Sequence, residues 1–479
     1  MKAKRIFSTI LFFALSAAMA ASAGAKVTLP SIISDNMVLQ QQTEAALWGW
    51  SEPGRKVVVK TSWDHKKYTA VADSQSGKFS LTVTTPEAGG PYTIEFNDGE
   101  KLTVGNVLVG EVWFCSGQSN MEHYMKGFGG EPVEGAAELI SVADPKRQLR
   151  ICQVTKTSSL KEEESVEAKW WLNDSESVSL CSAVAYFFAD RLEKALDIPV
   201  AVIVDCWGGS TIWTWMSEEL LRKDFPWVDL RHLSGEREAG NEYQDPCMLY
   251  NGMVKPIVPY TFKGILWYQG CSDRGNPANY ANMQTAYVQM MRDIFNVPEA
   301  PFYFVQIAPF WYWDETDTQS GYFLTDGQEA TLDRIPHSGM VTTCDLGAYK
   351  SIHYPAKKPV GERLALLALT HDYGVKGINA DPPRFDGFRI EEGKVLAHFT
   401  MCGGLNPINT PLSGFEIAGP DGVYHEAEAM VNPGCYDEVM VWSEEVPEPV
   451  NARYCYRNWC HGMLYNNSGI PACPFRTEK

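Results

Sequence analysis

The sequence predicts an α/β protein, with a three-layer domain built on a parallel sheet and a smaller β-domain on either side. From residue 107 to residue 377, short apolar runs typical of buried strands alternate with stretches whose apolar residues recur at helical spacing. Such alternation is typical of a parallel sheet covered by helices on both faces. Before and after this segment, short runs are separated by Gly, Pro, Asp and Asn turns. The expected division is a leader at 1–25, a β-sandwich-like domain at 26–106, the α/β domain at 107–377 and a C-terminal β-domain at 378–479.

The first 25 residues have the pattern of a secretory signal peptide. A basic start is followed by an apolar stretch from Ile6 to Ala21 and by small residues around Ala23 and Ala25. An uncleaved membrane anchor is the alternative interpretation. No later stretch reaches the roughly 18 uninterrupted apolar residues of a membrane helix. We therefore expect an exported protein, periplasmic or extracellular, whose mature form has no membrane span.

The charge balance excludes one class of partner. The formal net charge is −18, and removal of three leader cations, Lys2, Lys4 and Arg5, takes it from −18 to −21. Nucleic-acid binding needs clustered Lys and Arg to neutralise phosphates, so no nucleic-acid partner is expected. An anionic sugar is not excluded, because a local Arg can outweigh the overall field.

The cysteines point to neither a dense disulfide framework nor a metal. Most of the 12 are isolated on apolar runs, where Cys commonly acts as a small buried hydrophobe. Only Cys455, Cys460 and Cys473 cluster, and one pair among them would suit a disulfide. No Cys-x-x-Cys or His-x-x-x-His spacing suggests zinc, and we predict no metal.

The predicted elements follow in chain order. The first β-domain lacks a titratable cluster, and we expect it to have a structural or glycan-contacting role. Its expected strands are 57–59, 68–71, 79–83 and 92–96. The α/β domain has expected strands at 107–114, 201–206, 264–268, 302–307 and 340–345, and expected helices at 182–196, 280–295 and 360–371. The last domain has expected strands at 389–390, 395–399, 415–418 and 439–442.

The most informative motif is a serine that follows the first strand of the α/β domain. The apolar run from Val107 to Phe114 breaks into small and polar residues around Ser119. In an α/β fold, reactive groups lie at the carboxyl ends of strands, and a nearby glycine allows the sharp turn that exposes a hydroxyl. The motif is not Gly-x-Ser-x-Gly, so the usual α/β-hydrolase elbow does not apply. A hydrogen-bonded serine in a strand-to-loop transition is the alternative.

Three further stretches lie at expected strand ends. Gly208 and Gly209 follow a strand, where paired glycines let backbone amides approach an oxyanion; a tight turn is the alternative. Gln269 ends another strand and is followed by small polar residues, including Asp273. His353 lies on a loop between a late strand and a helix, where a general base would be placed, although most histidines are structural or lie on the surface.

In this order the blocks resemble the SGNH-type sialate O-acetylesterase family of carbohydrate esterases over nearly the whole mature chain. The resemblance implies an SGNH-hydrolase-like fold and cofactor-free hydrolysis of acetyl esters on sugar hydroxyls. It also implies that Ser119 is the nucleophile, that His353 is its base, and that the Ser119 amide with Gly208 or Gly209 holds the oxyanion. The matching blocks are 29–30, 34–40, 48–50, 117–121, 207–209, 267–270, 305–306, 361–365, 464–466 and 474–477.

Two blocks depart from the family pattern. The third usually reads Trp-Tyr-Gln-Gly-Glu-Ser-Asn, and here Cys271 replaces Glu and Asp273 replaces Asn. An ionised Asp273 cannot donate to an oxyanion and would disfavour a second negative charge nearby. Asn276 is a candidate replacement donor.

The histidine block usually reads Asp-Ile-His-Pro, whereas this chain has Ser351 where the family has Asp. Loss of an orienting carboxylate matters, since changing one to its amide in a model protease lowers turnover about 10⁴-fold. Three outcomes are open. Asp345 could orient His353, Ser351 or a backbone carbonyl could do so in a dyad, or the enzyme could be slow or inactive.

We therefore expect an exported esterase acting on an O-acetylated glycan or sialic acid, with His123 and Tyr124 at the substrate rim. A decayed esterase that binds glycans without hydrolysing them is the main alternative. A glycosidase is a third reading, based on aromatic-rich segments such as 311–315, but no carboxylate pair is singled out. The acetylated position and the oligomeric state are not determined by the sequence.

Overall fold

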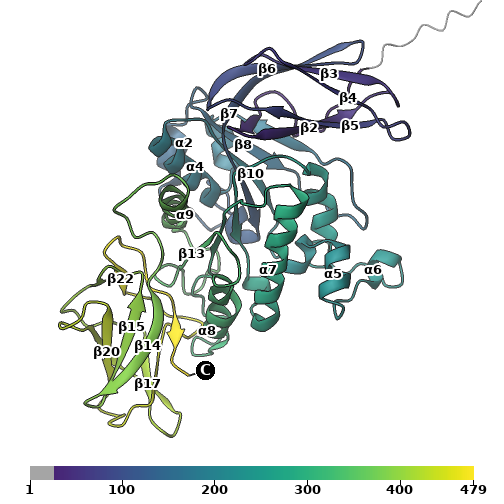
Figure 1. Ribbon diagram of the computed structural model, residues 1–479. Coiled ribbons are helices and arrows are strands. Elements are labelled where there is room, and N and C mark those ends of the chain that lie inside the picture. The colour runs from purple at the N-terminus through teal and green to yellow at the C-terminus, as the bar shows by residue number, and fades with distance from the viewer. Residues whose placement is uncertain (1–25, 479) are drawn as a thin grey trace, which may run out of the picture.

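The computed structural model describes residues 26–478, and its centre is a twisted, mostly parallel sheet (Figure 1). The expected leader at 1–25 lies outside the described residues. The strand order is β13-β12-β11-β7-β10-β8-β9, in which only β9 runs antiparallel to its neighbour. The parallel pairs confirm the predicted α/β class. These strands are β7 (Lys101–Gly117), β8 (Leu149–Val154), β9 (Ala168–Trp171), β10 (Val200–Cys206), β11 (Gly264–Tyr268), β12 (Phe302–Val305) and β13 (Ser338–Val341).

Helices cover both faces of this sheet (Figure 1). Alternate residues of β7 separate the two cores: Trp113 packs with residues of α4 and α9, whereas Phe114 packs with residues of α7. Because both faces are buried, the strands read as continuous apolar runs. The helices are α1 (Ser119–Glu122), α2 (Ala136–Ser141), α3 (Ser175–Leu180), α4 (Ala183–Leu196), α5 (Glu218–Asp224), α6 (Arg231–Ser234), α7 (Pro277–Ile294), α8 (Gln319–Tyr322) and α9 (Lys357–His371). Short 3₁₀ or π turns are η1 (Ile212–Trp215), η2 (Tyr250–Val254), η3 (Lys255–Ile257), η4 (Cys271–Asp273), η5 (Phe323–Gln328) and η6 (Glu329–Thr331).

The N-terminal β-region is joined to the central sheet by one long strand. The first half of β7 pairs with β6 and β1, and its second half pairs with β10 and β11. The expected boundary between residues 106 and 107 therefore falls inside β7. The other strands are β1 (Val38–Gln40), β2 (Glu44–Trp50), β3 (Lys56–Thr61), β4 (Lys67–Val71), β5 (Lys78–Thr84) and β6 (Gly89–Asn97).

The C-terminal region is β-rich, as predicted, and forms two four-stranded antiparallel sheets around a third core. It lies beside the ends of the later central strands (Figure 1), where the Gly462 amide donates to the Cys344 carbonyl. Its strands are β14 (Arg384–Glu391), β15 (Lys394–Thr400), β16 (Leu405–Asn406), β17 (Phe415–Ala418), β18 (Tyr424–Glu426), β19 (Glu428–Val431), β20 (Glu438–Trp442), β21 (Asn451–Tyr454), β22 (Tyr465–Asn466) and β23 (Phe475–Arg476).

Two strands end earlier than predicted, and the first of them, expected at 302–307, is β12, which ends at Val305. The apolar run at 340–345 continues β13 only to Val341. Beyond it, the Thr343 hydroxyl donates to the Gln306 carbonyl and the Leu346 amide donates back to the Thr343 carbonyl. These turn contacts end the strand, so Asp345 lies on a loop.

Candidate active site

Ser119 begins helix α1 immediately after the sharp turn that ends β7. Gly117 has a φ of +138°, and a side chain there would collide with the Tyr268 carbonyl of β11. The Gln118 amide donates to that same carbonyl at 3.0 Å, while the Gln118 Oε1 accepts from the Gly270 amide at 2.8 Å. These contacts fix the turn between β7 and β11. Ser119 itself stays partly exposed at the carboxyl edge of the sheet.

Gly208, which follows β10, lies against Ser119. A Cβ placed on Gly208 would lie 3.2 Å from the Ser119 Cβ and 3.2 Å from a Glu122 carboxylate oxygen. The Gly208 amide donates to Glu122 Oε2 at 2.6 Å. This arrangement differs from the expected oxyanion role of Gly208, because its N–H already has an anionic acceptor. No described residue accepts a hydrogen bond from the amides of Ser119 and Gly209.

His353 is held by Glu131, a residue that the sequence analysis did not single out. The distance from His353 Nδ1 to Glu131 Oε2 is 2.7 Å, and the Ser351 hydroxyl donates to Glu131 Oε1 at 3.0 Å. Burial favours a higher pKa for Glu131, but the hydrogen bond and charge of His353 outweigh it and lower the pKa. An ionised Glu131 accepts the Nδ1 proton, which leaves Nε2 as the basic nitrogen.

Asp345, expected as one candidate to orient His353, is engaged elsewhere. Its carboxylate pairs with both terminal nitrogens of Arg363 on α9, at 2.9 and 2.5 Å, and both side chains are largely buried. Asp345 therefore does not orient His353, because the Arg363 guanidinium faces the loop after β13 and binds the Asp345 carboxylate through two hydrogen bonds. Ser351 does contribute, but through Glu131 and the His353 carbonyl rather than the His353 ring.

Asn120 ties the serine turn to the histidine loop. Its Nδ2 donates to the Ile352 carbonyl at 3.1 Å, and its Oδ1 accepts from Lys357 Nζ at 2.6 Å. Lys357 is fully buried, and its ammonium lies 3.6 Å from the centre of the Tyr354 ring. Burial lowers the pKa of Lys357 well below its usual range. The two candidate catalytic residues are therefore brought to one edge of the sheet by a shared buried network.

Gln269 and Asp273 stabilise the loop that follows β10. Gln269 Nε2 donates to the Ser210 carbonyl at 2.9 Å and to Asp273 Oδ2 at 2.5 Å, and the same Asp273 oxygen accepts from the Ile212 amide at 3.0 Å. Burial raises the pKa of Asp273 to about 7. Neither side chain forms a hydrogen bond with Ser119. Asn276 is exposed and accepts from Asn279, so it does not replace the missing amide donor.

The two expected rim residues have different positions. His123 is fully buried and its Nε2 lies 3.0 Å from the Glu131 carbonyl, so it supports the loop and does not line the rim. Burial lowers the pKa of His123 to about 4. Tyr124 is half-buried and donates to Glu122 Oε1 at 3.1 Å. Phe128, which was not predicted, packs edge-on against the His353 ring with centroids 5.3 Å apart.

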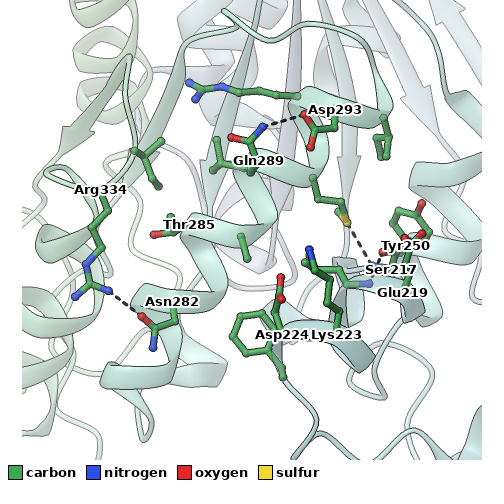
Figure 2. Close-up of a pocket in the computed structure, with 18 of the residues that line it drawn as sticks. Ser217, Glu219, Lys223, Asp224, Tyr250, Asn282, Thr285, Gln289, Asp293 and Arg334 are labelled. Atoms are coloured by element: carbon green, nitrogen blue, oxygen red, sulfur yellow. Dashed lines mark hydrogen bonds between the residues drawn. The ribbon is translucent and has the colours of Figure 1, made fainter.

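A large cavity lies away from these residues. It has a volume of about 900 Å³ and is lined mainly by α5, α7 and the turn at 334–336. Figure 2 shows Lys223 and Asp224 on one wall, with Asn282 and Gln289 of α7 opposite. Its lining includes neither Ser119 nor His353. No group of His, Cys, Asp and Glu side chains suited to a metal is found among residues 26–478, and no helix there is long and apolar enough to cross a bilayer.

The class is that of the serine carboxylic-ester hydrolases: Ser119 follows a buried parallel strand, and the adjacent Asn120 binds the loop that carries the carboxylate-bound His353. A family model described as "Carbohydrate esterase, sialic acid-specific acetylesterase" matches residues 109–370, which is more than half of the chain. The protein belongs to this carbohydrate esterase family.

Relatives and a solved structure agree with this membership. Sialate O-acetylesterases of Pongo abelii and Homo sapiens are 28% and 27% identical over 426 residues, covering 79% of this chain and 76% of each relative. A carbohydrate acetylesterase from Xanthomonas citri of known crystal structure is 30% identical, with a TM-score of 0.84. That match covers 95% of this chain and 100% of the other, so it extends over both flanking β-regions.

Proposed function

We propose that this protein is an exported carbohydrate O-acetylesterase that removes acetyl groups from sugar hydroxyls through an acetyl-enzyme on Ser119. The observation that carries the proposal is the 2.7 Å contact between His353 and Glu131. It supplies the orienting carboxylate that the histidine block lacks in sequence. Export rests on the signal-peptide pattern of residues 1–25.

In the proposed reaction, His353 Nε2 accepts the Ser119 hydroxyl proton as the oxygen attacks the acetyl carbonyl. Glu131 stabilises the imidazolium that forms and keeps the proton on Nδ1. His353 then donates its proton to the departing sugar oxygen. Water, deprotonated by the same nitrogen, attacks the acetyl-enzyme and releases acetate.

The oxyanion is assigned to the amides of Ser119 and Gly209. Neither amide has an acceptor among the described residues, whereas the Gly208 amide donates to Glu122. A preorganised amide donor contributes about 3 kcal/mol to the stabilisation of an oxyanion. Gly208 would join them only if the Glu122 carboxylate moved away from it.

Acetate release from 4-nitrophenyl acetate tests the proposal. The mature protein is expected to hydrolyse the ester, and the Ser119→Ala variant is expected to fall to the uncatalysed rate. Ser141→Ala, at an exposed position of α2, is the matched control and should keep full activity.

One observation favours the alternative of a glycan-binding protein with impaired catalysis: the Glu122 carboxylate occupies the Gly208 amide next to Ser119. Equal background rates in the wild type and in Ser119→Ala would support this alternative and exclude the esterase. N-terminal sequencing of the exported protein tests whether the leader is removed. Cleavage at the predicted site gives a first residue near Ala23 or Ala25.

A further inference from the structure

We propose that the stacked pair Trp207 and Tyr243 forms the sugar-binding subsite beside Ser119, and that it takes the ring of a neutral acetylated sugar. The inference rests on the proposed function, whose substrate class it narrows.

The pair lies at the glycine turn that contacts Ser119, the candidate nucleophile. Trp207 directly precedes Gly208, and a Cβ on Gly208 would lie 3.2 Å from that of Ser119. The Trp207 and Tyr243 rings stack with centroids 6.0 Å apart and an interplanar angle of 30°, and both side chains stay half-buried. Aromatic rings at a polar site edge offer apolar faces that suit the C–H faces of a pyranose.

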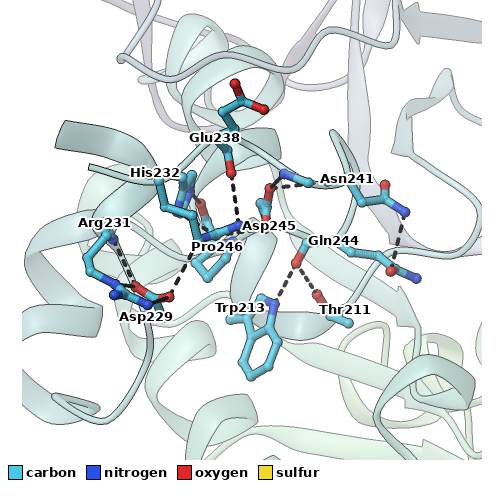
Figure 3. Close-up of polar contacts among 12 residues, drawn as sticks. Thr211, Trp213, Asp229, Arg231, His232, Glu238, Asn241, Gln244, Asp245 and Pro246 are labelled. Atoms are coloured by element: carbon cyan, nitrogen blue, oxygen red, sulfur yellow. Dashed lines mark hydrogen bonds and ion pairs between the residues drawn. The ribbon is translucent and has the colours of Figure 1, made fainter. Parts of the chain in front are cut away.

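Tyr243 is held in place by its neighbours before any substrate arrives. The Gln244 carbonyl accepts from the Thr211 hydroxyl at 3.0 Å and from Trp213 Nε1 at 2.6 Å, as Figure 3 shows. The Gln244 side chain donates to the Gly209 carbonyl at 3.0 Å. Because Gly209 has a φ of +78° and its missing side chain would meet the Tyr243 ring, the ring seats directly on the glycine turn.

A second set of contacts rigidifies the same segment. The Asp245 carboxylate accepts from the amides of Gly240 and Asn241 at 2.5 and 3.1 Å (Figure 3). It also pairs with Arg237 at 3.1 Å. A preorganised segment loses little conformational entropy when a ligand binds, which favours recognition by a shallow surface.

The charges around the pair favour a neutral ring. Lys156 Nζ lies 5.6 Å from the Trp207 ring centre, but it is paired with Glu122 at 2.6 Å. Glu122 also accepts hydrogen bonds from the Tyr124 hydroxyl and the Gly208 amide, which fix its carboxylate in place. A sugar carboxylate would therefore have to compete with Glu122 for Lys156.

The first arginine after β11 in the chain also has its partners within the protein. Arg274 stacks on Tyr312 at 3.9 Å and donates to Asn458 Oδ1 at 2.8 Å. Recognition of a carboxylated sugar normally uses an arginine free to form a two-pronged pair. The formal net charge of −18 adds a repulsive field.

Steady-state kinetics with three acetyl esters distinguishes binding of the sugar ring from hydrolysis of the ester. Ethyl acetate has no ring, 6-O-acetylglucose is neutral, and 9-O-acetyl-N-acetylneuraminic acid carries a carboxylate. The wild type is expected to have a kcat/KM at least about tenfold higher for the neutral sugar than for the anionic one. Tyr243→Leu is expected to raise KM for 6-O-acetylglucose by about fivefold to tenfold, and to raise it more than it raises KM for ethyl acetate.

Two further variants serve as controls for Tyr243→Leu. Tyr243→Phe keeps the ring and should keep the wild-type KM. Trp227→Ala removes a half-exposed aromatic residue that packs on Trp213 instead of Trp207, and it should change neither parameter. An unchanged KM in Tyr243→Leu would overturn the subsite. A higher kcat/KM for the anionic sugar in the wild type, lost in Lys156→Met, would overturn the proposal that the subsite takes a neutral sugar.

Failure of the proposed function is distinguishable from failure of this inference. A wild type that hydrolyses none of the three esters contradicts the esterase alone. Calorimetric titration of Ser119→Ala with 6-O-acetylglucose then measures the affinity of the subsite for the sugar without hydrolysis. Weaker binding after adding Tyr243→Leu supports the subsite, and equal binding or no binding overturns it.

Discussion

Glu131 holds His353 through a 2.7 Å contact between two residues that are 222 positions apart in the chain. The carboxylate comes from the loop after α1, and the imidazole comes from the loop before α9. The orienting carboxylate therefore comes from the loop that follows the helix begun by Ser119. The two loops that carry the proposed chemistry thus stabilise each other.

The first prediction concerns this contact. Glu131→Gln keeps the shape of the side chain but removes the charge that stabilises the imidazolium, so kcat is expected to fall by about 10²–10⁴-fold. Initial rates on 4-nitrophenyl acetate measure the change. Glu134→Gln, an exposed position on the same loop, is the matched control. Equal activity of Glu131→Gln and wild type would show that the contact is not part of catalysis.

Asp345 is predicted to matter for stability and not for turnover. Its pair with Arg363 is largely buried, so Asp345→Asn leaves the guanidinium without its anion, at a cost of about 3 kcal/mol in the free energy of unfolding. Urea denaturation measures that change, and the kcat of the folded variant should stay within about twofold of wild type. A large loss of kcat with unchanged stability would return Asp345 to the active site.

The fold was largely predictable from sequence because its signals are local. Buried parallel strands give continuous apolar runs, and α4 and α9 show apolar residues at helical spacing, so both were found within a few residues. The glycine blocks and Ser119 were recognisable because short motifs at strand ends repeat within the family. The long strand β7 was divided between two expected domains because its pattern changes where its pairing partners change.

The pairings inside the site were not predictable in the same way. Glu131 lies in a Gly-rich loop with no periodic pattern, and only the tertiary fold brings it to His353. Asp345 had a favourable position in sequence, but it pairs with Arg363, which lies nearly two turns into α9. A carboxylate near a glycine-rich turn after Ser119 was the available signal, and it is too common to single out one residue. Glu122 was missed for the same reason.

Gly208 should tolerate no side chain. In Gly208→Ala the new methyl group would press on the Ser119 Cβ and on Glu122, each about 3.2 Å away, so Ser119 has to shift. Small displacements of a nucleophile cost about 10²-fold in rate, and kcat on 4-nitrophenyl acetate should fall by that order. Gly387→Ala, in β14 with no atom within 4 Å of the added carbon, should behave as wild type. Wild-type rates in Gly208→Ala would show that the turn relaxes without cost.

Asp205 should make the protein less stable as the pH rises. It lies fully buried in β10, neither carboxylate oxygen has a hydrogen-bond partner among the described residues, and burial raises its pKa from 3.8 to about 8. Between these two values the folded state keeps a proton that the unfolded state has lost. The free energy of unfolding therefore decreases as the pH rises from about 4 to 8, by up to about 5 kcal/mol.

Asp205→Asn removes this ionisation and keeps the size of the side chain. The variant should be more stable than wild type at pH 8, and the advantage should shrink toward pH 4, where Asp205 is protonated in both states. Urea denaturation at pH 4, 6 and 8 measures the difference, with Asp224→Asn at an exposed position as the control. A stability difference that does not change between pH 4 and pH 8 would mean that Asp205 does not titrate in this range.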